Sequence, residues 1–181
     1  MRDRISIEIK QSSNKLKIQT KYKKNNGLSW NNNHSEVVYT LNVPNNVNLD
    51  SIELVNGDLE LNGVTGRLDA DLVNGSLKSD GLTASTKIEM VNGDMEIRFT
   101  DLSNAEKIKL ESVNGNIELY LPSSADATIE AETVSGRISN EFGLKVIKHK
   151  YVGSQMNGVI GNGNIQINLE NINGRIAIKE G

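Results

Sequence analysis

The sequence contains no cysteine among its 181 residues, and it has only two prolines. Without cysteine the chain has no disulfide, no thiolate metal site and no cysteine nucleophile, although this absence is neutral about the cellular compartment. Aromatic residues are also scarce, at 4% of the chain, with two Phe and one Trp. A thin coil filled by Leu, Ile, Val and Met tolerates this composition better than a β-sandwich does.

Long apolar runs are missing too. No segment reaches the length of a membrane-spanning helix, and the start of the chain, Met1–Lys10, carries five charged side chains in place of a signal-peptide core. From the sequence, either the protein stays inside the cell or the chain lacks its targeting end.

The net charge of −3 conceals an asymmetry. Residues 1–49 carry eight Lys/Arg and three Asp/Glu, a net charge of +5, whereas residues 50–181 carry twelve against twenty, a net charge of −8. A basic segment can bind nucleic acid, but neither the aromatic content nor an RNA-binding motif supports this here. We therefore expect no nucleic-acid partner and interpret the two parts as lying against each other.

An Asn-Gly pair preceded by Val or Ile repeats through the second part. Its polar residue is Asn56, Asn74, Asn92, Asn114 and Asn173, with Ser135 in the same place of a sixth unit. The positions of successive members differ by 18, 18, 22, 21 and 38, so the last gap contains an insertion or a degenerate coil. Apolar and polar residues alternate around each pair, which predicts strands with one buried face. The inward positions include one column of Leu59, Leu77, Met95, Ile117, Ile138 and Ile176.

Two all-β architectures use such a unit. Asn-Gly favours type I′ hairpins, which would give an antiparallel meander. Alternatively, each unit is one coil of a β-solenoid, in which equivalent residues stack about 4.8 Å apart. The solenoid is favoured because stacked Asn side chains can hydrogen-bond along a ladder, whereas a meander gives no reason for the same Asn to recur with a fixed period. The alternation lacks the six-residue aliphatic period of left-handed solenoids, so a right-handed parallel β-helix of about six to seven coils over residues 50–181 is preferred.

The run from Val37 to Leu49, followed by repeated Val-Asn-Gly units and by the late run from Met156 to Ile167, resembles the bacterial putative-adhesin domain family of unknown function. The resemblance covers about residues 35–181. It implies a β-solenoid, usually in secreted or membrane-anchored proteins, and hence a location in the cell envelope or outside the cell. It implies no activity for any residue.

Residues 1–49 are expected to form capping strands over Ile5–Ile9, Lys15–Lys23 and Ser35–Val43, within one domain overall. A solenoid needs such a cap at its open end, and the lysine-rich face of the second strand protects an exposed edge. Between these strands lies a polar loop that carries Trp30 and His34. An exposed Trp can stack on a sugar ring, but a hairpin loop is the more ordinary interpretation.

One column two residues before each Val or Ile is always acidic, with Glu53, Asp71, Glu89, Glu111, Glu132 and Glu170. A wet stripe of carboxylates is expected, with Lys87 and Lys109 reducing the repulsion. Carboxylates can bridge Ca²⁺, but the nonapeptide of calcium-binding β-rolls is absent, so no metal site is predicted. His34 and His149 cannot form a metal cluster alone. The glycines from Gly158 to Gly163 are read as turns.

Arg98, Arg137 and Arg175 lie at outward positions, and an acidic stripe beside basic residues is found in β-helices that cleave acidic polysaccharides. Such lyases need long loops around a cleft, and this chain has regular coils. The sequence therefore predicts no catalytic residue and no cofactor. It favours a non-catalytic structural or adhesive module, with a surface glycan or a second copy as partner. The alternatives are a carbohydrate-active or cation-binding β-helix and a scaffold that self-assembles through the last coil, Ile176–Gly181.

Overall fold

The computed structural model describes residues 5–22, 36–149 and 153–181. These residues are all-β and fall into two compact units, Met1–Leu41 and Asn42–Gly181. The loop with Trp30 and His34 lies outside the described residues. The boundary between the units comes earlier than the expected 49/50. Asn45 accepts a hydrogen bond from the Thr65 N–H, and the Leu49 N–H donates to Arg67, so the residues before position 50 already join the second unit.

The first unit is built on an antiparallel hairpin of β1 (Ile5–Gln11) and β2 (Leu16–Tyr22), in which Ile9 faces Ile18. Lys21 forms an ion pair with Glu8 at 2.6 Å. The expected third strand over Ser35–Val43 is wrong for its described part, because residues 36–43 pair with no strand. Val38 is 80% exposed in this segment.

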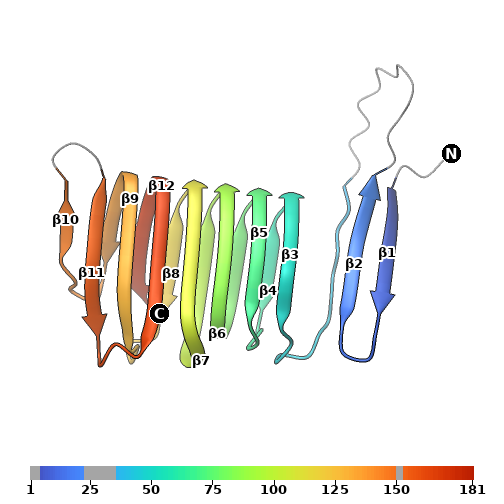
Figure 1. Ribbon diagram of the computed structural model, residues 1–181, viewed down its shortest axis with the longest axis horizontal. Coiled ribbons are helices and arrows are strands. Elements are labelled where there is room, and N and C mark those ends of the chain that lie inside the picture. The colour runs from blue at the N-terminus through green and yellow to red at the C-terminus, as the bar shows by residue number, and fades with distance from the viewer. Residues whose placement is uncertain (1–4, 23–35, 150–152) are drawn as a thin grey trace, which may run out of the picture. The chain divides into compact units, whose positions relative to one another are not determined.

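The second unit stacks its strands in two layers (Figure 1). Its first half contains β3 (Leu49–Asn56), β4 (Leu59–Asn62), β5 (Leu68–Asn74), β6 (Leu77–Asn92), β7 (Met95–Asn114) and β8 (Ile117–Leu121). Each coil pairs in parallel with the next, with Asn56 opposite Asn74 and Asn74 opposite Asn92. A meander would pair successive strands antiparallel. The long strands β6 and β7 bend from one layer to the other and contain register shifts where they do so.

The second half departs from sequential stacking. It contains β9 (Ala127–Asn140), β10 (Val146–Lys148), β11 (Ser154–Ile160) and β12 (Ile165–Glu180). The last strand, β12, lies between β7 and β8 on one side and β9 on the other, parallel to all three. β11 and β10 continue the stack beyond β9 as antiparallel strands. The long last gap of the repeat therefore holds the antiparallel pair β10 and β11.

This order corrects the argument for self-assembly. The residues Ile176–Gly181 were expected to present an open edge in the last coil. Instead, Ile176 is paired with both Ile117 and Ile138, so β12 has neighbours on both sides.

The core lies between the two layers. Of the predicted inward column, all but Leu59 are buried, and Ile117 and Ile176 are fully enclosed. Leu59 is half-buried because it belongs to the first coil, which has a neighbour on one side within this unit. Each Å² of apolar surface that is buried stabilises the folded state by about 25 cal/mol, so this column is a main source of the stability of the second unit.

The Asn-Gly corners are not type I′ turns. Among the described residues Ser51 is the single non-glycine residue with positive φ, so the Asn residues keep ordinary backbone angles. The glycine after each Asn takes the unusual conformation, with φ of 135° at Gly93. A Cβ atom on Gly93 would lie 1.6 Å from the carbonyl oxygen of Gly75 in the neighbouring coil. Glycine is therefore required at this corner by close backbone stacking.

Candidate functional site

Five of the six residues predicted to form a polar ladder are joined side chain to side chain. The Nδ2 atoms of Asn74, Asn92, Asn114 and Asn173 each donate to the Oδ1 atom of the neighbouring Asn at 2.9 Å, beginning with Asn56. Asn173 lies between Asn114 and Ser135, because β12 is inserted there. Ser135 occupies the last place of the column, opposite Asn173. The ladder is exposed and holds one corner of the stack.

The residue after each corner glycine adds a second row of contacts. The Asp58 carboxylate accepts hydrogen bonds from the Ser76 N–H at 2.7 Å and from the Ser76 hydroxyl at 2.8 Å. These bonds lower the pKa of Asp58. Asp94 makes the equivalent contact with the Asn116 N–H at 2.7 Å. The corner is thus fixed by its own residues.

The acidic column runs along the outer surface of the layer that contains β3 and β5, here called the front layer; β4 and β8 belong to the back layer (Figure 1). In spatial order its members are Glu53, Asp71, Glu89, Glu111, Glu170 and Glu132, each opposite the next. All are exposed except the half-buried Glu111. The outward orientation expected from the alternation is therefore found in the structure.

Local charges set the ionisation of this column. Lys87 lies 2.7 Å from Glu89, and Lys109 lies 2.7 Å from Glu111. The hydrogen bond from Lys87 lowers the pKa of Glu89, and the same contact raises the pKa of Lys87. Asp71 has no such partner among the described residues, and desolvation together with the charge of Glu89 raises its pKa.

An aliphatic column runs beside the acidic one, and its role is not evident from the sequence alone. It consists of the residues before each corner, Val55, Val73, Val91, Val113, Ile172 and Val134. Five of them are exposed, by 39% to 66%, and Val113 is half-buried. Each lies two residues after an acid, so the period of two already places both on the same outward face.

The acidic and aliphatic columns border a shallow depression of about 580 Å³. It extends over five coils, from Asp71 to Glu132, and its lining includes the inward residues between the two columns, such as Leu72 and Met90. A smaller depression of about 260 Å³ adjoins it around Glu132, Glu170 and Gln155. We call the larger one the front groove.

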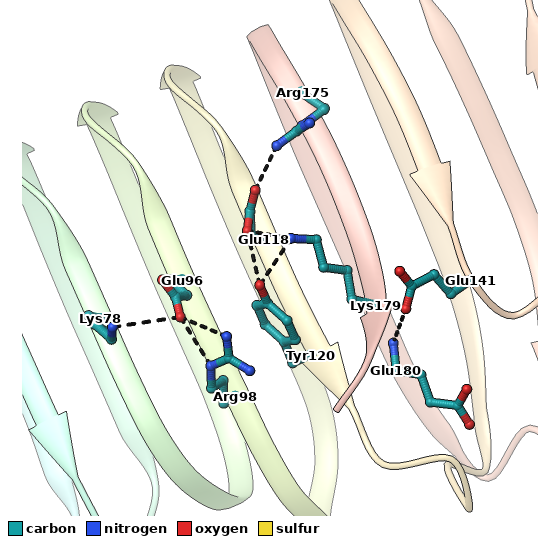
Figure 2. A network of polar contacts seen from close by, with 9 residues as sticks. All are labelled: Lys78, Glu96, Arg98, Glu118, Tyr120, Glu141, Arg175, Lys179 and Glu180. Carbon is teal, nitrogen blue, oxygen red and sulfur yellow. Dashed lines mark hydrogen bonds and ion pairs between the residues drawn. The ribbon is translucent and has the colours of Figure 1, made fainter.

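The outer surface of the back layer carries a polar network (Figure 2). Glu118 accepts hydrogen bonds from Arg175 at 2.6 Å, from Lys179 at 2.8 Å and from the Tyr120 hydroxyl at 3.2 Å. Arg98 lies over the Tyr120 ring, 3.5 Å from its centre. The hydrogen bond from Lys179 is the main cause of the lowered pKa of Glu118, and the Tyr120 hydroxyl and the Arg175 charge add to it.

This network joins the β12 coil to its neighbours. Glu118 and Tyr120 belong to β8, whereas Arg175 and Lys179 belong to β12. Two of the three arginines considered for catalysis, Arg98 and Arg175, are thus engaged in structural contacts, and Arg137 is exposed opposite Arg175.

The turn between β11 and β12 is held by Asp126, a residue outside the repeated columns of the sequence. The Asp126 carboxylate accepts hydrogen bonds from the backbone N–H groups of Asn162 at 2.7 Å, Gly163 at 2.6 Å and Asn164 at 3.1 Å. These bonds lower its pKa, with the Asn164 N–H as the largest cause. The predicted turn near Gly161 is therefore anchored to the start of β9.

Within the described ranges, no group of three or more His, Asp or Glu side chains is arranged to hold a metal ion. His149 is exposed at the end of β10. The part of the chain that the structure describes also contains no helix long and apolar enough to cross a membrane.

Comparisons with known proteins agree with this architecture. No curated protein matches the chain. Among solved structures, the chain is similar to the crystal structure of a "putative cell adhesion protein" from Clostridium sporogenes, with 19% identity and a TM-score of 0.54 over 98% of this chain and 76% of that one. At this identity the similarity concerns the fold. The model of the family described as Toastrack DUF4097 matches residues 2–179. Because this match spans nearly the whole sequence, the chain belongs to the Toastrack DUF4097 family.

Proposed function

We propose that this chain is a non-catalytic adhesive module of a bacterial envelope protein and that it binds its partner through the front groove. The observation that carries the proposal is the row of aliphatic side chains along the stack, five of whose six members are exposed. Scattered exposed apolar residues are ordinary, but a contiguous row of them marks an interaction surface. The likeness to a protein described as a putative cell adhesion protein supports the same proposal.

The construction of the stack suits an adhesive surface. The Asn ladder fixes one edge of the coils, so the exposed columns beside it keep their spacing when a partner binds. Two of the five acids around the groove, Glu89 and Glu111, are paired with Lys87 and Lys109. A rigid, regular face of this kind favours binding over catalysis, which needs convergent acid, base or nucleophilic groups.

The proposal extends to the form of the stack. We infer a right-handed β-solenoid. In Figure 1 the front strands β3 and β5 point upward, the chain returns through β4 and, farther along the stack, through β8 in the layer behind, and the stack advances from right to left. This direction of winding supports the right-handed form. That the N-terminal strands act as a cap stays a prediction, as does the location in the cell envelope.

Adhesion is tested with fluorescent beads that carry the full chain. We expect retention of the beads on a lawn of bacterial cells under flow, and loss of retention when Val73 and Val91 are both replaced by Lys. A matched control, Val38→Lys, adds a charge at an exposed aliphatic residue of the first unit and should leave retention unchanged. Equal retention of all three proteins would contradict the assignment of the front groove.

A further inference from the structure

The front groove has two unlike walls. Acid and aliphatic side chains stand two residues apart on the same strands, about 6.6 Å from each other. The residue between them points inward, so the two columns form parallel ridges with a furrow between. The acidic wall contains five acids. Two of them are paired with Lys87 and Lys109, so the wall has a formal net charge of −3. The aliphatic wall is bordered by the uncharged Asn ladder.

The shape of the groove favours a helical ligand over an extended one. The groove runs along the stack, across strands whose backbone groups are already paired with neighbouring coils. An extended peptide lying there would find no free sheet edge for its backbone, whereas a helix satisfies its own backbone hydrogen bonds. Side chains repeat about every 5.4 Å along a helix face, close to the spacing of about 4.8 Å between coils. Five coils span about 19 Å, the length of about 13 helical residues.

From the groove's two walls we propose that its ligand is a basic amphipathic helix of a partner protein. Its apolar residues lie in the furrow against Val91 and Ile172, and Lys or Arg side chains on one flank contact the acidic wall. Because the charge is on one wall alone, the ligand's basic flank must face that side, which fixes its orientation. This inference rests on the proposed adhesive function and names the class of partner.

The probe is a synthetic amphipathic peptide, with Leu on one face and Lys along one flank, that is long enough to be helical in water, at about 18 residues. Binding to the full chain is measured by fluorescence anisotropy of the labelled peptide. The first variant replaces Glu132 and Glu170 with Gln, because neither acid has an ion-pair partner among the described residues. The second replaces Val134 and Ile172 with Ser. The control Glu106→Gln removes an exposed charge away from the groove.

We expect each double variant to weaken binding by about tenfold, the removal of charge acting through Coulomb attraction and the Ser variant through lost apolar contact. Glu106→Gln should bind like the parent protein. A peptide with Glu in place of Lys should bind at least about tenfold more weakly, and the difference should shrink in high salt. A thermal unfolding curve is measured for each variant to check that it is folded at the temperature of the binding assay.

Three outcomes would overturn the inference. Equal binding of the Lys and Glu peptides would show that the acidic wall does not select the ligand, and undiminished binding by both double variants would place the site elsewhere. If the parent protein fails to bind the Lys peptide while the bead assay still maps adhesion to Val73 and Val91, the partner class is wrong and the adhesive function stands.

Discussion

The corner glycines offer a sharp test of the stacking, because the chain provides its own control. Gly93 lies inside the stack, where an added Cβ would meet the Gly75 carbonyl oxygen at 1.6 Å. Gly57 has nearly the same backbone, with φ of 147° against 135°, but no described atom lies within 4 Å of its added Cβ. Replacing each glycine with Ala therefore separates conformational strain from the close approach of coils.

The expected magnitudes differ clearly. Gly57→Ala should lose about 1–3 kcal/mol through its strained backbone alone. Gly93→Ala carries the same strain and also forces two coils apart. This displaces the hydrogen bond from the Gly75 N–H to the Asn92 carbonyl oxygen at 3.1 Å and the ladder bond from Asn92 to Asn74 at 2.9 Å. At about 1 kcal/mol for each of these two bonds, the total loss should reach about 3–5 kcal/mol.

The measurement is urea unfolding followed by circular dichroism in the β-sheet region, with both variants compared at the same protein concentration. A change in the slope of the transition would reveal partial unfolding of the coils, which stacked repeats permit. The reasoning is refuted if Gly93→Ala and Gly57→Ala lose the same free energy within about 1 kcal/mol.

Further predictions concern the ladder, the core, the β11–β12 turn and the absence of a metal. Asn92→Ala removes two ladder bonds and should lose about 1–3 kcal/mol in urea unfolding; an unchanged midpoint would mean that the ladder contributes nothing. Ile117→Ala should lose about 2–5 kcal/mol because its side chain is fully buried, and a loss below about 0.5 kcal/mol would contradict its place in the core. The pKa of Asp126 is lowered in the folded state, so its stabilising effect is present above the unfolded pKa of about 3.9 and is lost as the pH falls through the lower folded value. Asp126→Ala should therefore destabilise the protein at pH 7 and make little difference at pH 2, and a constant difference would oppose this account. The melting temperature should be the same in EDTA and in millimolar Ca²⁺; a rise of several degrees that Glu89→Gln abolishes would support a cation site instead.

Much of the stack could be predicted from repeated residues. The period of two around Ile117 and the corner Asn residues places the buried and exposed columns correctly, because one buried face fixes the register of a strand. The outward positions of Glu89 and Val91 follow from the same pattern. That the aliphatic residues of successive coils form one exposed row becomes evident only when the coils are stacked.

The order of the last coils could not be predicted in this way. Ser135 and Asn173 lie in units of the same pattern, so either unit can follow the coil of Asn114 without loss of alternation. The contacts that distinguish them are long-range, such as the bonds of Glu118 to Arg175 and Lys179. No local feature of the sequence contains this information.

The inserted position of β12 has a consequence for the order in which the protein folds during synthesis. The coils from β3 to β8 join residues 18 to 22 positions apart, such as Asn74 with Asn92 and Asn92 with Asn114, so each can add to the previous one as it leaves the ribosome. The β12 coil joins Asn173 to Asn114, 59 positions apart. At about 5–20 residues per second, β9 must wait several seconds for the strand that separates it from β8. During that interval the edge of β8 is open, so a chaperone or a neighbouring nascent chain can pair with it.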